Sequence, residues 1–122
     1  MSLAIALLVA SADVPDFLTA QERWVCQFHA FGSEEQVKTY FGVFRSHVED
    51  DWGQGATTIQ NDSDALVFAY SDIGNTDISG GVRKWVRIDI IDKKTNRFKR
   101  SIIDVAEPKG ASDQTVGECR RY

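Results

Sequence analysis

The chain has 122 residues, enough for one domain with a buried core and too few for two. Hydrophobic residues make up 43% and charged residues 26%, as in an ordinary soluble protein. The formal net charge of −4 excludes a dedicated nucleic-acid surface, which needs a much more basic domain. Because residues 1–75 carry a net charge of −8 and residues 76–122 carry +4, we expect the two halves to pair within one domain.

Residues 3–12 form an apolar run that ends in Ala-Ser-Ala, the small-x-small pattern that signal peptidase recognises. The run is too short to span a bilayer, which takes about 20 apolar residues. We expect residues 1–12 to be a signal-peptide remnant whose basic start lies upstream, with a short apolar helix as the alternative. Residues 13–122 would then form a single periplasmic or secreted β domain. Since residues 3–10 are apolar on every side, we also expect them to pack on a second copy of the chain.

The two cysteines, Cys26 and Cys119, lie in segments with strand-like alternation. Two cysteines usually pair in an exported protein and usually remain free thiols in a cytosolic one. We therefore expect a disulfide that ties the first strand to the last, with two free core thiols as the alternative. The bridge would enclose about 94 residues and stabilise the fold by about 4–5 kcal/mol on the chain-entropy model.

The first strand begins at Arg23, and one of its faces carries Trp24, Cys26, Phe28 and Ala30. The next stretch, residues 33–52, carries signals for both a helix and a strand. Ser33 followed by Gln36 is a capping-box signature. Helical spacing is shown by Val37, Tyr40, Phe41, Phe44 and Val48. Against a helix, residues 39–44 are rich in strand formers, and Gly42 within a helix would cost about 1 kcal/mol relative to alanine. The pattern alone slightly favours the helix.

Two hairpins follow, each joined by polar turn residues. The first pairs residues 57–60 with 65–70, and the second pairs residues 82–91 with 97–105. On the longest strand one face carries Val86, Ile88 and Ile90, and the other carries Trp85, Arg87 and Asp89. Residues 116–121 form the last strand. The sequence therefore predicts an all-β antiparallel meander of about seven or eight strands, closed or nearly closed into a barrel.

Five motifs resemble those of a group of small, uncharacterised exported bacterial proteins. They are W-x-C-x-F from Trp24, TYFGVF, IQNDSDALVFA, IDKKTNRFKRS and G-x-C ending at Cys119. The resemblance covers roughly residues 23–121 and rests on strand and turn patterns, so it implies a fold and no activity. It implies strand–turn–strand for residues 37–52, and we therefore expect an extended segment with a turn near residues 45–47. A looser likeness is to periplasmic lysozyme inhibitors of the small eight-stranded barrel type.

A weak candidate metal site consists of His47, Glu49 and Asp51, which would share one face of a strand. One imidazole and two carboxylates can hold a divalent cation. A solvated acidic turn is the more ordinary interpretation, and we expect no metal and no cofactor.

Two further groups are candidate binding residues. A basic hairpin carries Lys93, Lys94, Arg97, Lys99 and Arg100. It could dock an anionic partner or an acidic lipid surface, or its charges could keep a strand edge from aggregating. Candidates for lining a ligand cavity are Trp24, Phe28, Phe41, Phe68, Tyr70 and Trp85. An eight-stranded barrel is just wide enough to fill itself with side chains or to hold one small ligand, and we expect a filled one.

The sequence shows no nucleophile elbow, P-loop or dinucleotide fingerprint, so we lean against an enzyme. It favours an exported module that binds an unknown small molecule or protein, with no nucleic acid and no membrane span. One alternative is an inhibitor of a cell-wall hydrolase. Lysozyme is basic, and the acidic half of the chain could supply the loops that such an inhibitor needs. A small hydrolase is the other alternative.

Overall fold

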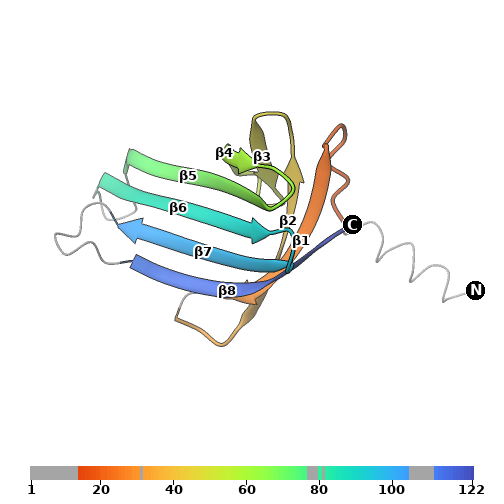
Figure 1. Ribbon diagram of the computed structural model, residues 1–122. Coiled ribbons are helices and arrows are strands. Elements are labelled where there is room, and N and C mark those ends of the chain that lie inside the picture. Colours follow the sequence, from red (N-terminus) through yellow and green to blue (C-terminus); the bar gives the residue numbers. More distant parts are fainter. Residues whose placement is uncertain (1–13, 31, 77–79, 81, 105–111) are drawn as a thin grey trace, which may run out of the picture.

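The computed structural model describes residues 14–30, 32–76, 80, 82–104 and 112–122. The strands are β1 (Glu22–His29), β2 (Gln36–Val43), β3 (His47–Asp50), β4 (Gly55–Asn61), β5 (Ala65–Thr76), β6 (Val82–Asp92), β7 (Arg97–Asp104) and β8 (Ser112–Arg121). Each strand pairs antiparallel with the next, and β1 pairs with β8 to close a barrel (Figure 1). The predicted all-β meander is therefore confirmed, with eight strands and full closure. The expectations for residues 1–12 lie outside the described residues.

Residues 37–52, which carry signals for both a helix and a strand, are mostly extended, as expected. β2 ends at Val43, and the turn to β3 is held by a 2.9 Å hydrogen bond from the backbone N–H of Phe44 to the carbonyl oxygen of His47. Burial follows the two-residue period of a strand, since Thr39, Phe41 and Val43 are all buried. The helical spacing therefore has no structural counterpart here. No described residue belongs to a helix long and apolar enough to cross a membrane.

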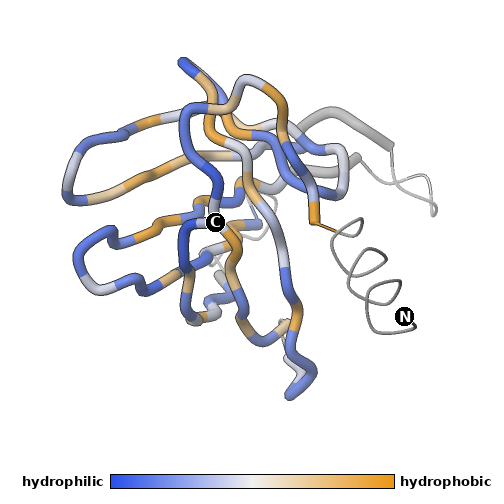
Figure 2. The backbone as a smooth tube through the Cα atoms, turned by 90° about the vertical axis from the view of Figure 1, so that its right-hand side faces the viewer, coloured by the Kyte–Doolittle hydropathy of each residue, from blue (hydrophilic) through white to orange (hydrophobic). Residues whose placement is uncertain are grey.

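Apolar side chains fill most of the barrel interior. Apolar and polar residues alternate along the strands (Figure 2), and the apolar ones that point inward are buried. The largest fully buried ones are Trp24, Phe41, Phe68, Phe98, Leu66, Ile91, Val43 and Val48. The rings of Phe41 and Phe68 meet edge to face at 5.1 Å. Apolar side chains therefore pack against one another in this part of the interior.

Glu22 closes one end of the barrel, which we call the closed end. Its carboxylate accepts hydrogen bonds from Trp24 Nε1 at 3.1 Å, Asn61 Nδ2 at 2.9 Å and Arg121 at 3.0 Å, and it pairs with Lys93 Nζ at 3.0 Å. Burial alone would raise the pKa of Glu22. The hydrogen bonds from Asn61, Lys93 and Trp24, together with the charge of Lys93, outweigh burial and hold that pKa below its usual value.

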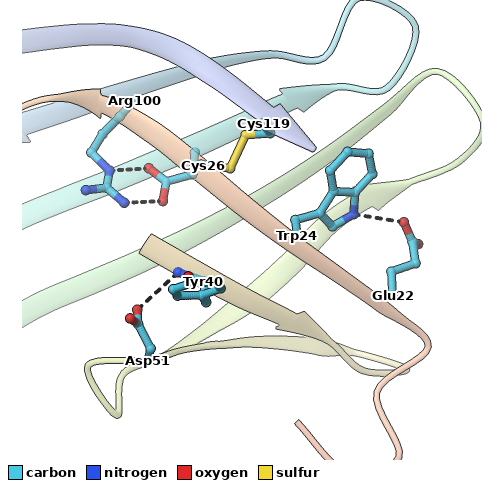
Figure 3. The surroundings of a disulfide bond; sticks show 8 residues. Glu22, Trp24, Cys26, Tyr40, Asp51, Arg100 and Cys119 are labelled. Atoms are coloured by element: carbon cyan, nitrogen blue, oxygen red, sulfur yellow. Dashed lines mark hydrogen bonds and ion pairs between the residues drawn. A yellow bond between two sulfur atoms is a disulfide. The ribbon is translucent and has the colours of Figure 1, made fainter. Parts of the chain in front are cut away.

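The seam between β1 and β8 carries the predicted disulfide. Cys26 and Cys119 are direct partners in the β1–β8 register, 4.0 Å apart at Cα, and they are bonded (Figure 3). Two residues further along β1, Phe28 stands opposite Gly117. A Cβ at Gly117 would lie 2.7 Å from Phe28 Cβ and would overlap the carbonyl oxygen of Gln27. Only glycine lets the strands approach so closely, which explains the glycine of the G-x-C motif.

Candidate functional site

A pocket of about 280 Å³ lies at the end of the barrel opposite Glu22. Its lining comes from β1, β2, β3, β6, β7 and the β3–β4 loop: Phe28, Ala30, Val37, Thr39, Asp50, Trp52, Gln54, Arg87 and Arg100. We call it the mouth pocket. It differs from the filled interior in having charged side chains as its floor.

The charged face of β6 points into the barrel. Asp89 is fully buried, while Ile88 and Ile90 beside it stand half-buried on the outer wall. The cause is the pairing of β6 with β7, in which Asp89 lies directly opposite Arg100. Arg100 donates two parallel hydrogen bonds, of 2.8 and 2.9 Å, to the carboxylate of Asp89. A buried charge needs such a partner, and this two-bond geometry satisfies both groups.

Asp50 organises the β3–β4 loop. One of its carboxylate oxygens accepts the backbone N–H groups of Trp52 and Gln54, both at 2.9 Å. The other accepts the hydroxyl of Tyr70 at 3.1 Å. Burial first, and then the charge of Asp50, raise the pKa of Tyr70, so that hydroxyl stays protonated and remains a donor. Asp50 thus fixes the rim of the mouth pocket and accepts three hydrogen bonds from neutral groups.

Arg87 has a different environment from its charged neighbours. Its guanidinium lies between two carboxylates, 3.8 Å from Asp50 Oδ2 and 3.7 Å from Asp89 Oδ2, distances too long for hydrogen bonds. Its Nε is buried and has no hydrogen-bond partner within the described part of the chain. The guanidinium also lies over the ring of Tyr70, 3.7 Å from its centre. Leaving a buried donor unsatisfied costs about 1–3 kcal/mol, so this group calls for an explanation.

The six aromatic candidates separate into two groups in the structure. Phe28 lines the mouth pocket, Tyr70 lies beneath Arg87, and Trp85 packs half-buried against the core. Trp24, Phe41 and Phe68 are part of the filled interior.

The basic hairpin does not present its five cations on one surface. Lys93 pairs with Glu22 at the closed end, and Lys94 pairs with Asp64 at 3.0 Å. Arg97 and Lys99 are exposed, but Arg100 is buried against Asp89. Arg100 therefore belongs to the mouth pocket and is not part of a basic patch on the outer surface.

The weak metal candidates are only partly brought together. His47 Nε2 lies 3.2 Å from Glu49 Oε1, whereas Asp51 accepts the backbone N–H of Tyr40 at 3.2 Å (Figure 3). Among the described residues, no three His, Cys, Asp or Glu side chains are grouped so that they could hold a metal ion.

A larger hollow of about 490 Å³ lies on the outer wall, over β6, β7 and β8. Its apolar wall includes Val116, which is 64% exposed, and its charged side chains, among them Lys99 and Glu118, also face solvent. The mouth pocket is the better candidate despite its smaller size, because its polar groups are buried and held in place before any ligand arrives.

Comparison of the chain with models of known protein families, with curated proteins and with solved structures finds no match. The function of the mouth pocket therefore has to be argued from its own residues.

Proposed function

We propose that the protein is an exported binding module that holds a small molecule in the mouth pocket. The observation that carries this proposal is the buried Arg87 Nε without a hydrogen-bond partner. In an ion cluster that serves only stability, buried donors are satisfied from within the protein, as Arg100 is. Arg87 also lines the mouth pocket, where a bound molecule would meet the 12% of this side chain that is exposed. The Cys26–Cys119 disulfide is compatible with an oxidising environment outside the cytoplasm.

The pocket chemistry favours binding over hydrolysis. A hydrolase needs a base that is free to take a proton from water or from a nucleophile. The two carboxylates that face Arg87 are both engaged, Asp50 by two backbone N–H groups and the Tyr70 hydroxyl, and Asp89 by Arg100. Neither is positioned as a free base.

Native mass spectrometry of freshly purified protein tests the proposal, because a retained molecule adds its mass to the chain. Val37→Phe places a ring in the pocket, where Val37 is part of the lining. Val116→Phe adds the same ring to the exposed outer wall and is the matched control. We expect the bound mass to disappear in the first variant and to remain in the second. A retained mass that survives Val37→Phe would place the ligand elsewhere.

Inhibition of a cell-wall hydrolase is the second candidate, and the exposed rim around the pocket favours it. Glu34 and Glu35 in the β1–β2 loop and Asp51 in the β3–β4 loop are exposed, and Trp52 beside them is 73% exposed. Acidic loops with an aromatic side chain suit a basic enzyme such as lysozyme. A lysozyme binding assay separates the two candidates, with Trp52→Ala and Glu34→Gln expected to weaken an inhibitor.

A further inference from the structure

We infer that the ligand of the mouth pocket is a monocarboxylate with a flat apolar body, and that Arg87 receives its carboxylate. This inference rests on the proposed function, because it names the chemistry of the ligand for the same pocket. It joins three observations, which are the Arg87 guanidinium with its long ion pairs, the hydrogen bonds already made by the two carboxylates around it, and the apolar walls of the pocket.

The first step concerns the sign of the ligand charge. Asp89 is neutralised by the two hydrogen bonds from Arg100, and Asp50 is stabilised by the hydrogen bonds from Trp52, Gln54 and Tyr70. Within the described part of the chain, Arg87 makes two long ion pairs, at 3.7 and 3.8 Å, and a contact with the Tyr70 ring. A cationic ligand would meet a guanidinium and find the nearby carboxylates already engaged. An anion would meet a cation that still has hydrogen bonds to give.

The second step concerns the geometry of the charged group of the ligand and the magnitude of its charge. A guanidinium is a planar fork of N–H donors that matches a carboxylate with two parallel bonds, as Arg100 and Asp89 already show in this barrel. A doubly charged group such as a phosphate ester is less suited, because Asp50 lies 3.8 Å from the same guanidinium and its hydrogen bonds come from neutral groups. Its negative charge opposes a second negative charge in the ligand.

The third step concerns the rest of the ligand. Ala30 and Val37 give the pocket apolar walls, and Trp52 stands on the rim with most of its side chain exposed. The backbone N–H of Trp52 is held by Asp50, so the Trp52 backbone is fixed beside the charged floor. The volume of about 280 Å³ is at the small end for ligand sites, which suits a single ring.

Three probes of nearly equal shape test the inference: benzoate, benzamide and benzamidine, which are anionic, neutral and cationic at pH 7. Binding is followed by calorimetry and by the amide NMR shifts of Thr39, Trp52 and Gln54. Benzoate should bind at least about tenfold more tightly than either of the others, the difference expected of hydrogen bonds to a charged acceptor. Trp52→Ala should weaken all three probes by a similar factor.

Two variants test the role of Arg87. Arg87→Lys keeps the charge and loses the fork, so the preference for benzoate should shrink by about fivefold or more. Asp50→Asn removes a competing negative charge from the pocket lining, so benzoate should bind more tightly and the ratio of benzoate to benzamide affinity should rise. An increase on removing a buried group is not what loss of structure would produce. Circular dichroism of both variants checks that the barrel is folded.

Contrary results separate the two proposals. If benzamide or benzamidine shifts the same amides and binds as well as benzoate, the inferred ligand class is wrong and the proposed function stands. The assignment of Arg87 is overturned if Arg87→Lys keeps the full preference for benzoate. Failure of all three probes overturns the inference, and the retained-mass experiment then decides whether the proposed function falls with it.

Discussion

Reduction of the Cys26–Cys119 disulfide should lower the free energy of unfolding by about 4–5 kcal/mol. The bonded residues are 93 positions apart in the sequence, so the bond restricts nearly the whole barrel when it is unfolded. On the chain-entropy model a loop of this length contributes about 4.7 kcal/mol at 25 °C. In the folded state Cys26 and Cys119 are direct partners in the β1–β8 register. The backbone pairing therefore holds them together without the bond, and most of the loss should come from the freer unfolded chain.

Urea unfolding of the oxidised and the reduced protein, followed by circular dichroism, measures this difference. A single domain of this size is expected to have a total stability of about 6–18 kcal/mol, so the reduced barrel should remain folded at 25 °C. Its melting temperature should fall by about 10–20 °C. The slope of the free energy against urea should rise on reduction, because an unbridged chain exposes more surface when it unfolds.

The double variant Cys26→Ala/Cys119→Ala is the control. It should be insensitive to reductant and slightly less stable than the reduced protein, because both side chains are buried and alanine leaves a small cavity. A difference below about 1 kcal/mol between the oxidised and reduced forms would refute the loop-entropy reasoning for this barrel. Two titratable thiols in the denatured, unreduced protein would show that the bond is absent.

Two further predictions concern the closed end and the seam. The lowered pKa of Glu22 means that its ionised form adds stability which is fully present above the unfolded pKa of about 4.5 and is lost as the pH falls through the folded pKa. Glu22→Gln should therefore flatten the acid limb of urea stability below that pH, relative to the exposed-site control Glu34→Gln, and equal slopes would contradict this. Gly117→Ala should cost about 1–3 kcal/mol or more, because its Cβ would overlap the Gln27 carbonyl oxygen. Gly55→Ala, which meets open space, should melt close to wild type, and matching losses in the two would count against the packing argument.

Much of the barrel could be predicted because strand signals are local. The alternating residue pattern from Trp24 to Phe28 and the polar turn residues before β5 are visible in the sequence, and so is the placement of both cysteines in strand-like segments. Residues 37–52 were harder, because Val37, Phe41, Phe44 and Val48 satisfy a helical period by coincidence. The strand formers of residues 39–44 and Gly42 opposed a helix, and the resemblance to a group of exported proteins then favoured strands there. The physical tie-breaker is the register of β2 with β1, a nonlocal contact that no window of sequence contains.

The mouth pocket could not be predicted as a whole, although the sequence indicated one of its ion pairs. A turn over residues 93–96 places Asp89 opposite Arg100, so an ion pair can be inferred from the sequence. The sequence does not reveal which face of β6 points inward, because Val86, Ile88 and Ile90 form the more apolar face. Burial of the charged face depends on Asp50 and Tyr70 arriving from two other strands. The sequence alone therefore groups Arg100 with the other cations of the basic hairpin.

The pairing of the first strand with the last also sets an order of events when the chain is made. Synthesis runs from β1 to β8, so Cys26 emerges long before its partner in the β1–β8 register exists. Until Cys119 follows, β1 has β2 on one side and an open edge on the other, and its thiol is available to wrong partners. The barrel therefore cannot close progressively during synthesis, because its closure and its oxidation both wait for β8.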